Sequence, residues 1–264
     1  MKVHPTAIIH EKASLGSGVS VGPYCTVGEA VEIGPDCELV SHVVLGGPTR
    51  IGEKNRFFPY ASVGLEPQDL KYKGEPTRLE IGDHNTFREF VTVHRGTEEG
   101  GGVTRIGNHN LLMAYCHVAH DCQLANHIVL ANGAALGGHV TIEDYVVLGA
   151  YCGIHQFSRI GRHSFIGAYT PVNRDVVPFS VTTEDRKAEI YGVNVVGLDR
   201  RGFSKKQIHA LRAAFRLLTQ PGLNTSQAVD AIEEQIQHVE QTGEGESLKQ
   251  LVEFIRAAKK GIVK

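Results

Sequence analysis

The chain has 264 residues, 41% of them hydrophobic, and its formal net charge is −2. A charge so close to zero argues against a general nucleic-acid-binding protein, which needs a basic surface. No apolar run approaches the ~20 residues that a membrane-spanning helix needs. The start of the chain, MKVHPTAIIHEKAS, lacks the charged head and the apolar stretch of a secretory signal. We therefore expect a cytoplasmic protein with no transmembrane segment.

The first two thirds of the chain repeat a six-residue pattern. Every sixth residue is apolar from Ile9 to Val63, from Ile81 to Val93 and from Ile106 to Val172. Such a period fits neither a helix nor a plain alternating strand. It is typical of a solenoid of hexapeptide repeats, in which three hexads close one triangular coil and residues 18 apart stack at roughly 4.8 Å. The sequence therefore predicts a parallel β-helix.

Two further positions in each hexad have a composition of their own. Glycine often follows the apolar residue, and we expect it to permit the backbone of the turn. The residue two positions before the apolar one is mostly small, and all five cysteines (25, 37, 116, 122 and 152) stand there. The cysteines are therefore predicted to be small buried core residues, rather than metal ligands or disulfides.

Two segments interrupt the repeat. Residues 65–79 are polar and contain two prolines, and residues 95–104 are rich in glycine. We interpret both as loops that leave the rod and rejoin it. Long loops on a rigid scaffold commonly carry function, although a tolerated insertion has the same sequence signature.

After Val172 the repeat ends, and from about residue 204 the apolar period becomes helical. Ser204 is a candidate N-cap for a helix over 205–219. A second helix is predicted over about 225–241, and a third begins at Ser247 with a capping box. The predicted organisation is thus a solenoid over residues 1–190 and a C-terminal helical domain over residues 191–264, which covers the open last coil.

Four histidines fall together if the coils stack as predicted. His117 and His120 flank Val118, while His139 and His155 occupy nearby positions in the next two coils. The register therefore places the four imidazoles along one edge of the rod. Three interpretations stay open at this point: a general base, a zinc site with an open position, or neutral side chains at a subunit interface.

A set of ordered motifs carries a family resemblance over nearly the whole chain. The motifs are DLKYKGEPTR (69–78), VHRGT (93–97), LLMAYCHVAHDC (111–122), LGGHV (136–140), GIHQF (153–157) and GVNVVGLDRRGF (192–203). The set closely resembles the UDP-N-acetylglucosamine 3-O-acyltransferase family. The resemblance implies a left-handed coil and the first reaction of lipid A biosynthesis, in which an (R)-3-hydroxyacyl chain passes from acyl carrier protein to the sugar 3-hydroxyl.

The same resemblance assigns the central roles at the site. His120 would be the general base, and Asp121 would orient or polarise it. Neighbours in a strand point to opposite faces, so a corner must intervene between these two residues. His139 would contact the substrate, and the backbone N–H of Gly138 would be the oxyanion donor.

Further residues would contact the substrate by resemblance. Lys71 would act as a point charge beside the phosphates. Ala168 matches the position at which side-chain bulk limits acyl length, and alanine there is intermediate. Val196 departs from the family, since some members carry an acid near the nucleotide at this position. The remaining substrate-contact candidates are Gln68, Asp69, His94, His117, His155, Gln156, Asn194, Arg200 and Arg201.

The resemblance also implies the partners. The protein would be a homotrimer with sites in the clefts between rods. From charge alone, we further expect acidic acyl carrier protein to meet basic residues of the tail (Arg200, Arg201, Lys205 and Lys206). It would need no metal and no cofactor, because the donor is the phosphopantetheine thioester of acyl carrier protein. An acetyl-coenzyme A-dependent sugar acetyltransferase, a zinc hydratase and a non-catalytic scaffold are the alternatives on the same solenoid.

Overall fold

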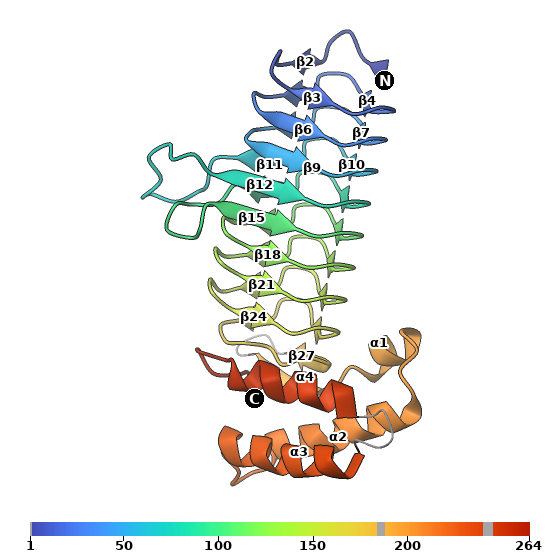
Figure 1. The fold of residues 1–264 in the computed structure, drawn as a ribbon, viewed down its shortest axis with the longest axis vertical. Coiled ribbons are helices and arrows are strands. Elements are labelled where there is room, and N and C mark those ends of the chain that lie inside the picture. Colours follow the sequence, from blue (N-terminus) through green and yellow to red (C-terminus); the bar gives the residue numbers. More distant parts are fainter. Residues whose placement is uncertain (1, 184–187, 240–244) are drawn as a thin grey trace.

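A computed structural model describes residues 2–183, 188–239 and 245–264. Short strands wind into a straight, three-sided rod with the N-terminus at one end (Figure 1). Two loops leave one side of the rod part-way along, and helices close its other end. The rod is therefore a parallel β-helix with a helical tail.

Each side of the rod is one sheet whose strands come from successive coils. Sheet A contains β1 (Lys2–Val3), β4 (Ser20–Val21), β7 (Glu38–Leu39), β10 (Arg56–Phe57), β13 (Thr86–Phe87), β16 (Leu111–Leu112), β19 (Val129–Leu130), β22 (Val147–Leu148), β25 (Phe165–Ile166), β27 (Ser180–Thr183) and β28 (Glu189–Val193). Sheet B contains β2 (Ile8–Ile9), β5 (Thr26–Val27), β8 (Val44–Leu45), β11 (Ser62–Leu65), β14 (Thr92–His94), β17 (His117–Val118), β20 (Ala135–Leu136), β23 (Gly153–Ile154) and β26 (Pro171–Val172). Sheet C contains β3 (Ser14–Leu15), β6 (Val31–Ile33), β9 (Thr49–Ile51), β12 (Arg78–Ile81), β15 (Val103–Ile106), β18 (Gln123–Leu124), β21 (Thr141–Ile142) and β24 (Arg159–Ile160).

The predicted stacking of residues 18 apart is confirmed. Val118 pairs with Leu136 and Leu136 pairs with Ile154, all in parallel register. Apart from a local register shift between Val63 and Leu65, the two loops add residues without changing this stacking, since Val93 pairs with both Val63 and Val118. Both loops, 66–77 and 95–102, leave the rod at the edge between sheets B and C, which we call the B–C edge.

The glycines after the apolar residues have a different cause from the one expected. Apart from Gly64, these glycines do not have a positive φ; left-handed backbone occurs instead two residues later in the turns, as at Tyr24 after Gly22 and Lys54 after Gly52. A Cβ on Gly22 would lie 1.7 Å from the carbonyl oxygen of Val40 in the next coil. These glycines are needed because successive coils approach each other too closely for a side chain.

The core is a narrow apolar column. The predicted branched residues fill it, and all five cysteines are free and buried there, so the prediction for the cysteines is confirmed. The left-handed corner residues instead point outward and stack ring on ring. On the edge between sheets C and A, the C–A edge, the stacked rings belong to His84, His109, His127, Tyr145, His163 and Phe179.

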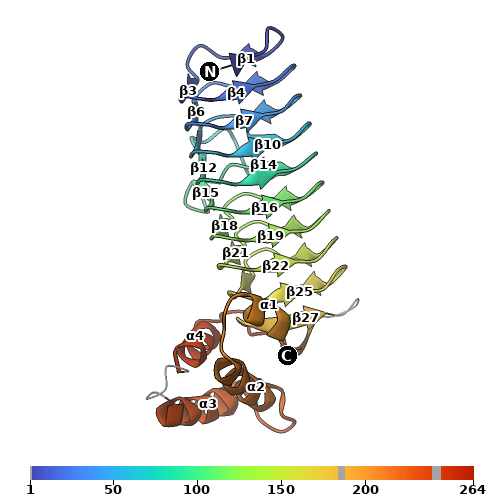
Figure 2. The same ribbon diagram turned by 90° about the vertical axis from the view of Figure 1, so that its right-hand side faces the viewer.

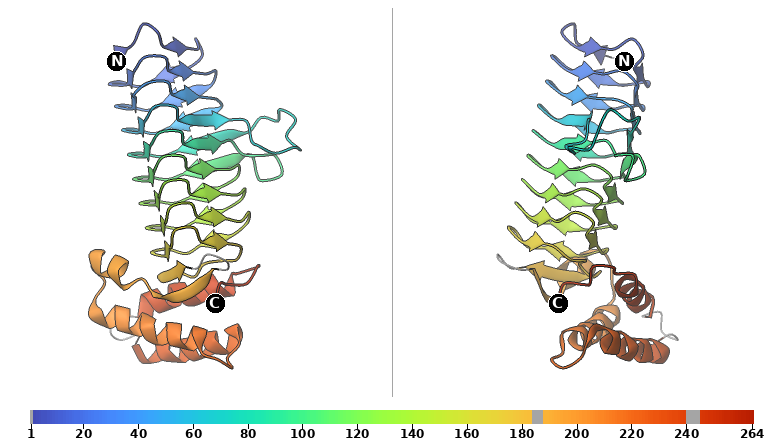
Figure 3. Two further views of the ribbon diagram at one scale, coloured as in Figure 1. Left: turned by 180° about the vertical axis from the view of Figure 1, so that it is seen from behind. Right: turned by 90° about the vertical axis from the view of Figure 1, so that its left-hand side faces the viewer.

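The helical tail packs on the last coil, as predicted. It contains α1 (Val195–Arg200), α2 (Lys205–Thr219), α3 (Thr225–Val239) and α4 (Gly245–Arg256). Val177 and Phe179 of the final coil share one apolar cluster with residues of α2, α3 and α4. Figure 2 shows these helices beneath the rod, and Figure 3 shows from behind that the loops lie on the opposite side from α1. No helix in the described segments is long and apolar enough to cross a membrane.

The helix boundaries confirm one sequence prediction and correct another. Ser204 caps α2 in a complete capping box with Gln207.

Ser247, in contrast, is not a cap: it is buried inside α4, which begins at Gly245. The side chain of Gln250 bonds to Glu246, one turn earlier, rather than returning to Ser247. The six-residue helix α1 was not predicted from sequence; Asn194 caps it by accepting a hydrogen bond from the Gly197 amide.

Candidate active site

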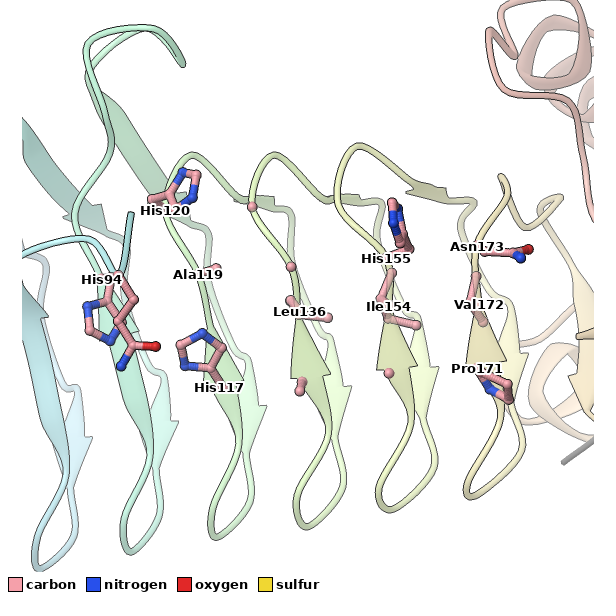
Figure 4. A pocket seen from close by; sticks show the side chains of 15 residues that line it. His94, His117, Ala119, His120, Leu136, Ile154, His155, Pro171, Val172 and Asn173 are labelled. Carbon is pink, nitrogen blue, oxygen red and sulfur yellow. The ribbon is translucent and has the colours of Figure 1, made fainter. Parts of the chain in front are cut away.

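A groove of about 610 Å³ runs along sheet B beside the B–C edge. His94, His117 and His120 lie at the end of the groove nearer the N-terminus, which is the upper end in Figure 1 and the left side of Figure 4. Mostly small or apolar residues line the following coils, with His155 among them. Its lining is Gln68, His94, His117, Ala119, His120, Ala135, Leu136, Gly137, Gly138, Gly153, Ile154, His155, Pro171, Val172 and Asn173. The three predicted histidines His117, His120 and His155 therefore share one groove.

The expected corner between His120 and Asp121 is present. Asp121 has a φ of 62°, so the chain turns there with left-handed backbone. This turn brings the carboxylate back toward its neighbour, and Nδ1 of His120 lies 2.7 Å from Oδ2 of Asp121. Aspartate is among the residues that adopt this conformation most readily. A single backbone corner thus converts adjacent residues into a hydrogen-bonded pair.

The second loop holds the carboxylate of Asp121 from its other side. The backbone N–H of Thr97 donates to Oδ1 at 2.9 Å, and the Thr97 hydroxyl donates to Oδ2 at 2.6 Å. Burial alone would raise the pKa of Asp121, but the hydrogen bonds from His120 and Thr97 outweigh it and hold the pKa below its usual value. The carboxyl group is therefore ionised at neutral pH and can only accept hydrogen bonds.

An ionised acceptor fixes the tautomer of the neutral imidazole. His120 must carry its proton on Nδ1 to bond to Asp121, which leaves a lone pair on Nε2. Within the described residues Nε2 of His120 has no hydrogen-bonding partner in the protein, and the ring lines the groove. A histidine with a free, basic nitrogen facing a groove has the arrangement required of a general base.

A backbone donor lies beside this imidazole. A Cβ placed on Gly138 would lie 2.6 Å from Cε1 and 2.8 Å from Nε2 of His120, so any side chain there would displace the imidazole. In the described part of the chain the Gly138 amide donates to no backbone acceptor. The free N–H and the free imidazole nitrogen thus line the same part of the groove.

His139 belongs to the same cluster without lining the groove. Its ring meets that of His120 edge-on with centroids 5.2 Å apart, and its Nε2 lies 3.8 Å from Oδ2 of Asp121. Burial lowers the pKa of His139 despite the attraction of Asp121. Its other face stacks on Phe157. The predicted clustering is confirmed, while contact of His139 with a substrate stays a prediction.

Two histidines at the upper end are held neutral. Burial lowers the pKa of His94, and burial together with the neighbouring His94 and His120 lowers the pKa of His117 to about 4. Nδ1 of His94 bonds to the backbone oxygen of Glu66 in the first loop, and Nδ1 of His117 lies 2.8 Å from the Thr92 hydroxyl. Neutral imidazoles here offer hydrogen bonds rather than charge.

Asp69 and Lys71 lie next to the groove in a second hollow of about 310 Å³ between the two loops. Lys71 is exposed, and its Nζ lies 2.9 Å from a carboxylate oxygen of Glu99 in the second loop. Such an exposed ion pair contributes little stability. The ammonium group of Lys71 therefore stays accessible to any anion that can displace Glu99.

The remaining predicted residues are elsewhere. Asn194 and Arg201 lie at the C–A edge, where Asn194 donates to the backbone oxygen of His163 and Arg201 covers the ring of Tyr145. Arg200 is an exposed residue of α1. Gln156 and Ala168 are exposed and outside the groove lining. The single chain therefore does not bring Asn194, Arg200 and Arg201 to His120.

The described residues contain one group with the composition of a metal site, made of His120, Asp121 and His139. Its potential ligand atoms lie within 4.8 Å of one another. However, Oδ2 of Asp121 already lies close to two donors, the Thr97 hydroxyl and His120. A cation would have to replace these hydrogen bonds, so the structure favours the hydrogen-bonded pair.

The sequence analysis missed two residues of the candidate site. Thr97 lies within the motif VHRGT, yet nothing in the repeat indicates where a loop residue returns to the rod. Asn173 lines the lower end of the groove. It is one coil below His155, and the 18-residue register could have found it.

Comparison with known proteins agrees with this geometry. Residues 175–263 match the family model described as domain 2 of UDP-N-acetylglucosamine O-acyltransferase, and residues 2–47 match the bacterial transferase hexapeptide model. A curated acyl-[acyl-carrier-protein]–UDP-N-acetylglucosamine O-acyltransferase from Halorhodospira halophila is 46% identical over 100% of this chain and 99% of its own length.

Solved structures extend the similarity to three dimensions. UDP-N-acetylglucosamine O-acyltransferase (LpxA) from Moraxella catarrhalis has a TM-score of 0.92 and 41% identity, with both chains covered completely. LpxA from Acinetobacter baumannii has a TM-score of 0.94 and 43% identity over 99% of each chain.

A rod of hexapeptide coils with a histidine–carboxylate pair on its flank defines a hexapeptide-repeat transferase. More narrowly, the chain belongs to the UDP-N-acetylglucosamine O-acyltransferase family, and it is an acyltransferase. The predicted left-handed sense of the β-helix is likewise confirmed.

We expect the imidazole of His117 to stay neutral down to low pH. An NMR titration of the folded protein, with the signal assigned by comparison with His117→Asn, should give a midpoint of about 4. Because the unfolded imidazole titrates near ~6.5, the contribution of His117 to the free energy of unfolding is lost as the pH falls from ~6.5 toward 4. A midpoint close to that of the unfolded residue would contradict the burial argument.

Proposed function

We propose that this chain transfers an (R)-3-hydroxyacyl group from acyl carrier protein to the 3-hydroxyl of UDP-N-acetylglucosamine, the first step of lipid A biosynthesis. The names of its relatives state the donor and the acceptor. The observation that carries the chemistry is the His120–Asp121 pair, whose free Nε2 opens into the groove beside the Gly138 amide.

The reaction needs three events at this place. Nε2 of His120 removes the proton of the sugar hydroxyl while its oxygen attacks the thioester carbonyl carbon. The carbonyl oxygen becomes an oxyanion, and the Gly138 N–H stabilises it. When the carbonyl re-forms, the carbon–sulfur bond breaks, and the departing thiolate takes the proton from His120. Atoms and charges balance without a metal or cofactor, so we propose that neither is required.

The first loop is the proposed site for the sugar nucleotide. Gln68 lines the groove itself, and Asp69 and Lys71 lie in the adjoining hollow. The diphosphate would compete with Glu99 for the ammonium group of Lys71. This exchange supplies charge for the phosphates without leaving an unpaired lysine in the free protein.

We predict that His120→Ala abolishes transfer, because no other group in the groove replaces the base. The loss should be about 10²- to 10⁴-fold in kcat, the usual contribution of a positioned general base. The assay follows radiolabelled UDP-N-acetylglucosamine with a hydroxyacyl donor on acyl carrier protein. Near-normal turnover would remove His120 from the mechanism.

Two controls accompany this assay. The melting temperature of His120→Ala should match that of the wild type, since the imidazole is partly exposed and fills no core position. Wild-type transfer should also persist after chelation of metals. Loss of activity with a chelator, together with stoichiometric zinc in the purified protein, would instead favour the zinc hydratase.

The lower part of the groove is the proposed place of the acyl chain. Below His117 the outward-facing residues of sheet B are Ala135, then Gly153, then Pro171, paired in register. A Cβ on Gly153 would meet no atom within 4 Å, so the space above it is open. Small residues in series thus leave a trough for an apolar chain. Ala168, in the last coils, remains the position proposed from the family resemblance to limit its length.

We therefore predict that Gly153→Leu shortens the accepted acyl chain. The Cβ of a leucine would meet no atom of this chain within 4 Å, so we expect folding to be unaffected. The measurement compares kcat/KM for acyl carrier proteins that carry hydroxyacyl chains of increasing length. The ratio of long to short donors should fall at least about tenfold, as expected when several methylenes lose their pocket. An unchanged ratio would place the acyl chain elsewhere.

We propose a homotrimer, on two observations besides the family resemblance. In the lower coils sheet A presents a column of apolar side chains on its outer face, in which Leu111, Val129 and Val147 are half-buried and Phe165 is exposed. Such a stripe on a flat face is typical of a subunit interface. In addition, Asn194 and Arg201 lie on a different edge from His120. They can only serve the same substrate if a neighbouring subunit supplies them.

Co-expression of two defective chains tests this shared site. One chain carries His120→Ala, and the other carries Arg200→Ala with Arg201→Ala. If each site takes His120 from one subunit and the arginines from the next, one site in each mixed trimer is intact, which makes about a quarter of all sites when the two chains assemble at random. We predict that about this fraction of activity returns. Each variant expressed alone is the control, and no recovery in verified mixed trimers would contradict the shared site.

The donor protein and the compartment complete the proposal. Basic residues at the start of the tail (Arg200, Arg201, Lys205 and Lys206) suit an acidic acyl carrier protein. The cytoplasm is the proposed compartment, consistent with five cysteines that are all free in the fold.

A further inference from the structure

The second loop closes tightly over the carboxylate of Asp121. A Cβ placed on Gly100 would lie 2.0 Å from Cγ of Asp121, and one on Gly96 would lie 2.8 Å from its Oδ1. The side chain of Asp121 is only 1% exposed as a result. Gly100 is thus explained by the need to approach one carboxylate, whereas Gly96 also lies against the backbone of Val103, and Gly101 and Gly102 have positive φ.

Thr97 is the residue of the second loop that contacts the carboxylate of Asp121. It is 6% exposed, and the loop folds around it, because the amides of Gly100 and Gly102 both donate to its backbone oxygen. The amide of Gly100 also lies 3.2 Å from the Thr97 hydroxyl oxygen. With this acceptor position occupied, the hydroxyl proton is directed to Oδ2 of Asp121 at 2.6 Å. The hydroxyl is therefore oriented as a donor.

A directed series of hydrogen bonds results. It runs from the Gly100 amide to the Thr97 hydroxyl, then to the Asp121 carboxylate, which also accepts from Nδ1 of His120. Hydrogen bonds in series polarise one another, and a buried network is stable only when each member has its partner. The amide of Asp121 is satisfied separately by the Thr104 hydroxyl at 2.7 Å. The carboxylate therefore has a fixed position and a fixed role as acceptor.

We propose that Thr97 is a positioning residue for the transfer reaction, which holds Asp121 as an acceptor so that His120 keeps its proton on Nδ1 and its basic Nε2 in the groove. This inference rests on the proposed function of His120. It assigns a role to the second loop that is separate from substrate contact. Thr97 does not line the groove but the adjoining hollow, beside Asp69 and Lys71; its hydroxyl is engaged with Asp121, so the hydroxyl acts through that carboxylate.

Loss of the hydroxyl has a defined chemical consequence. Without the donor from Thr97, burial favours the protonated form of Asp121 more strongly, and the pKa of the carboxyl rises. A protonated or rotated carboxyl group no longer requires a proton on Nδ1 of His120. The imidazole can then place its proton on Nε2, and in that tautomer it cannot accept the proton of a hydroxyl group at that atom.

Three variants test the proposal by kinetics. Thr97→Val keeps the shape but loses the hydroxyl, Thr97→Ser restores the hydroxyl, and Thr49→Val is the matched control. Thr49 is equally buried, at 3% exposure, and its hydroxyl donates to the Gly46 oxygen on another part of the B–C edge. For Thr97→Val we expect kcat to fall about 10- to 100-fold, as for other groups that orient a catalytic residue. KM for both substrates should stay within about twofold.

The pH profile separates positioning from loss of structure. In Thr97→Val the acidic limb of kcat should move to higher pH, because the carboxyl protonates more easily. Thr97→Ser should restore both kcat and the profile, and Thr49→Val should leave both unchanged. Equal losses in Thr97→Val and Thr97→Ser, or an unshifted profile in Thr97→Val, would overturn the proposal.

An NMR measurement tests the tautomer without relying on activity. Protein labelled with ¹⁵N-histidine should show His120, assigned with His120→Ala, protonated at Nδ1 in the wild type and in Thr97→Ser. In Thr97→Val a substantial Nε2-protonated population should appear. If His120 stays fully Nδ1-protonated in Thr97→Val, the proposal is wrong. If the tautomer shifts as expected but the wild type transfers no acyl group, the positioning role stands and the proposed function fails.

Discussion

Parallel hydrogen bonding between successive coils is the constraint on which this structure depends. Alternate amides along each coil donate to carbonyls in the next coil, as from Gly22 to Leu39 and from Gly137 to Ile154. This spacing leaves no room for a Cβ at Gly22, and it fixes which residues lie above one another. Side chains far apart in sequence are thereby held at the separation of neighbouring strands. The groove on sheet B is a direct product of that register.

The chemistry is concentrated at one edge of the rod, where a regular left-handed corner meets the two loops that interrupt the coils. The coil turns at Asp121 with left-handed backbone, and the two loops leave the rod at the same edge. Regular strands would point His120 and Asp121 to opposite faces, but the corner joins them. The rigid rod therefore fixes where the histidines lie, and the loops at its B–C edge supply the groups that contact them and Asp121. The loops close over the carboxylate and supply the cation beside the groove.

The sequence predicted those parts of the fold that the period controls. The stacking of Val118, Leu136 and Ile154, the burial of the cysteines and the grouping of the histidines all follow from counting residues. The helix over 205–219 was found because its cap and its apolar face are local signals. The role of glycine was misjudged, since close approach between coils is a property of the assembled rod and not of one hexad.

Other features have no local signal. Thr97 reaches Asp121 by the path of a loop, and no register specifies such a path. Ser247 matches a capping box in sequence, yet the helix starts earlier and buries it. Asn194 and Arg201 lie at the C–A edge of their own chain, and nothing in a linear pattern indicates which edge a tail will approach. The positions of residues that are set by tertiary packing therefore could not be predicted from the sequence.

The unbroken register on both sides of the loops has an evolutionary consequence. The coils before β11 contribute no groove residue, so the rod can lengthen or shorten there without altering the chemistry. Such changes must come as whole coils. Gain or loss of a single hexad would turn everything upstream by one side of the prism and separate the sheets. During evolution the rod can therefore change its length only by whole coils. The distance between the N-terminus and the reaction centre changes in the same steps.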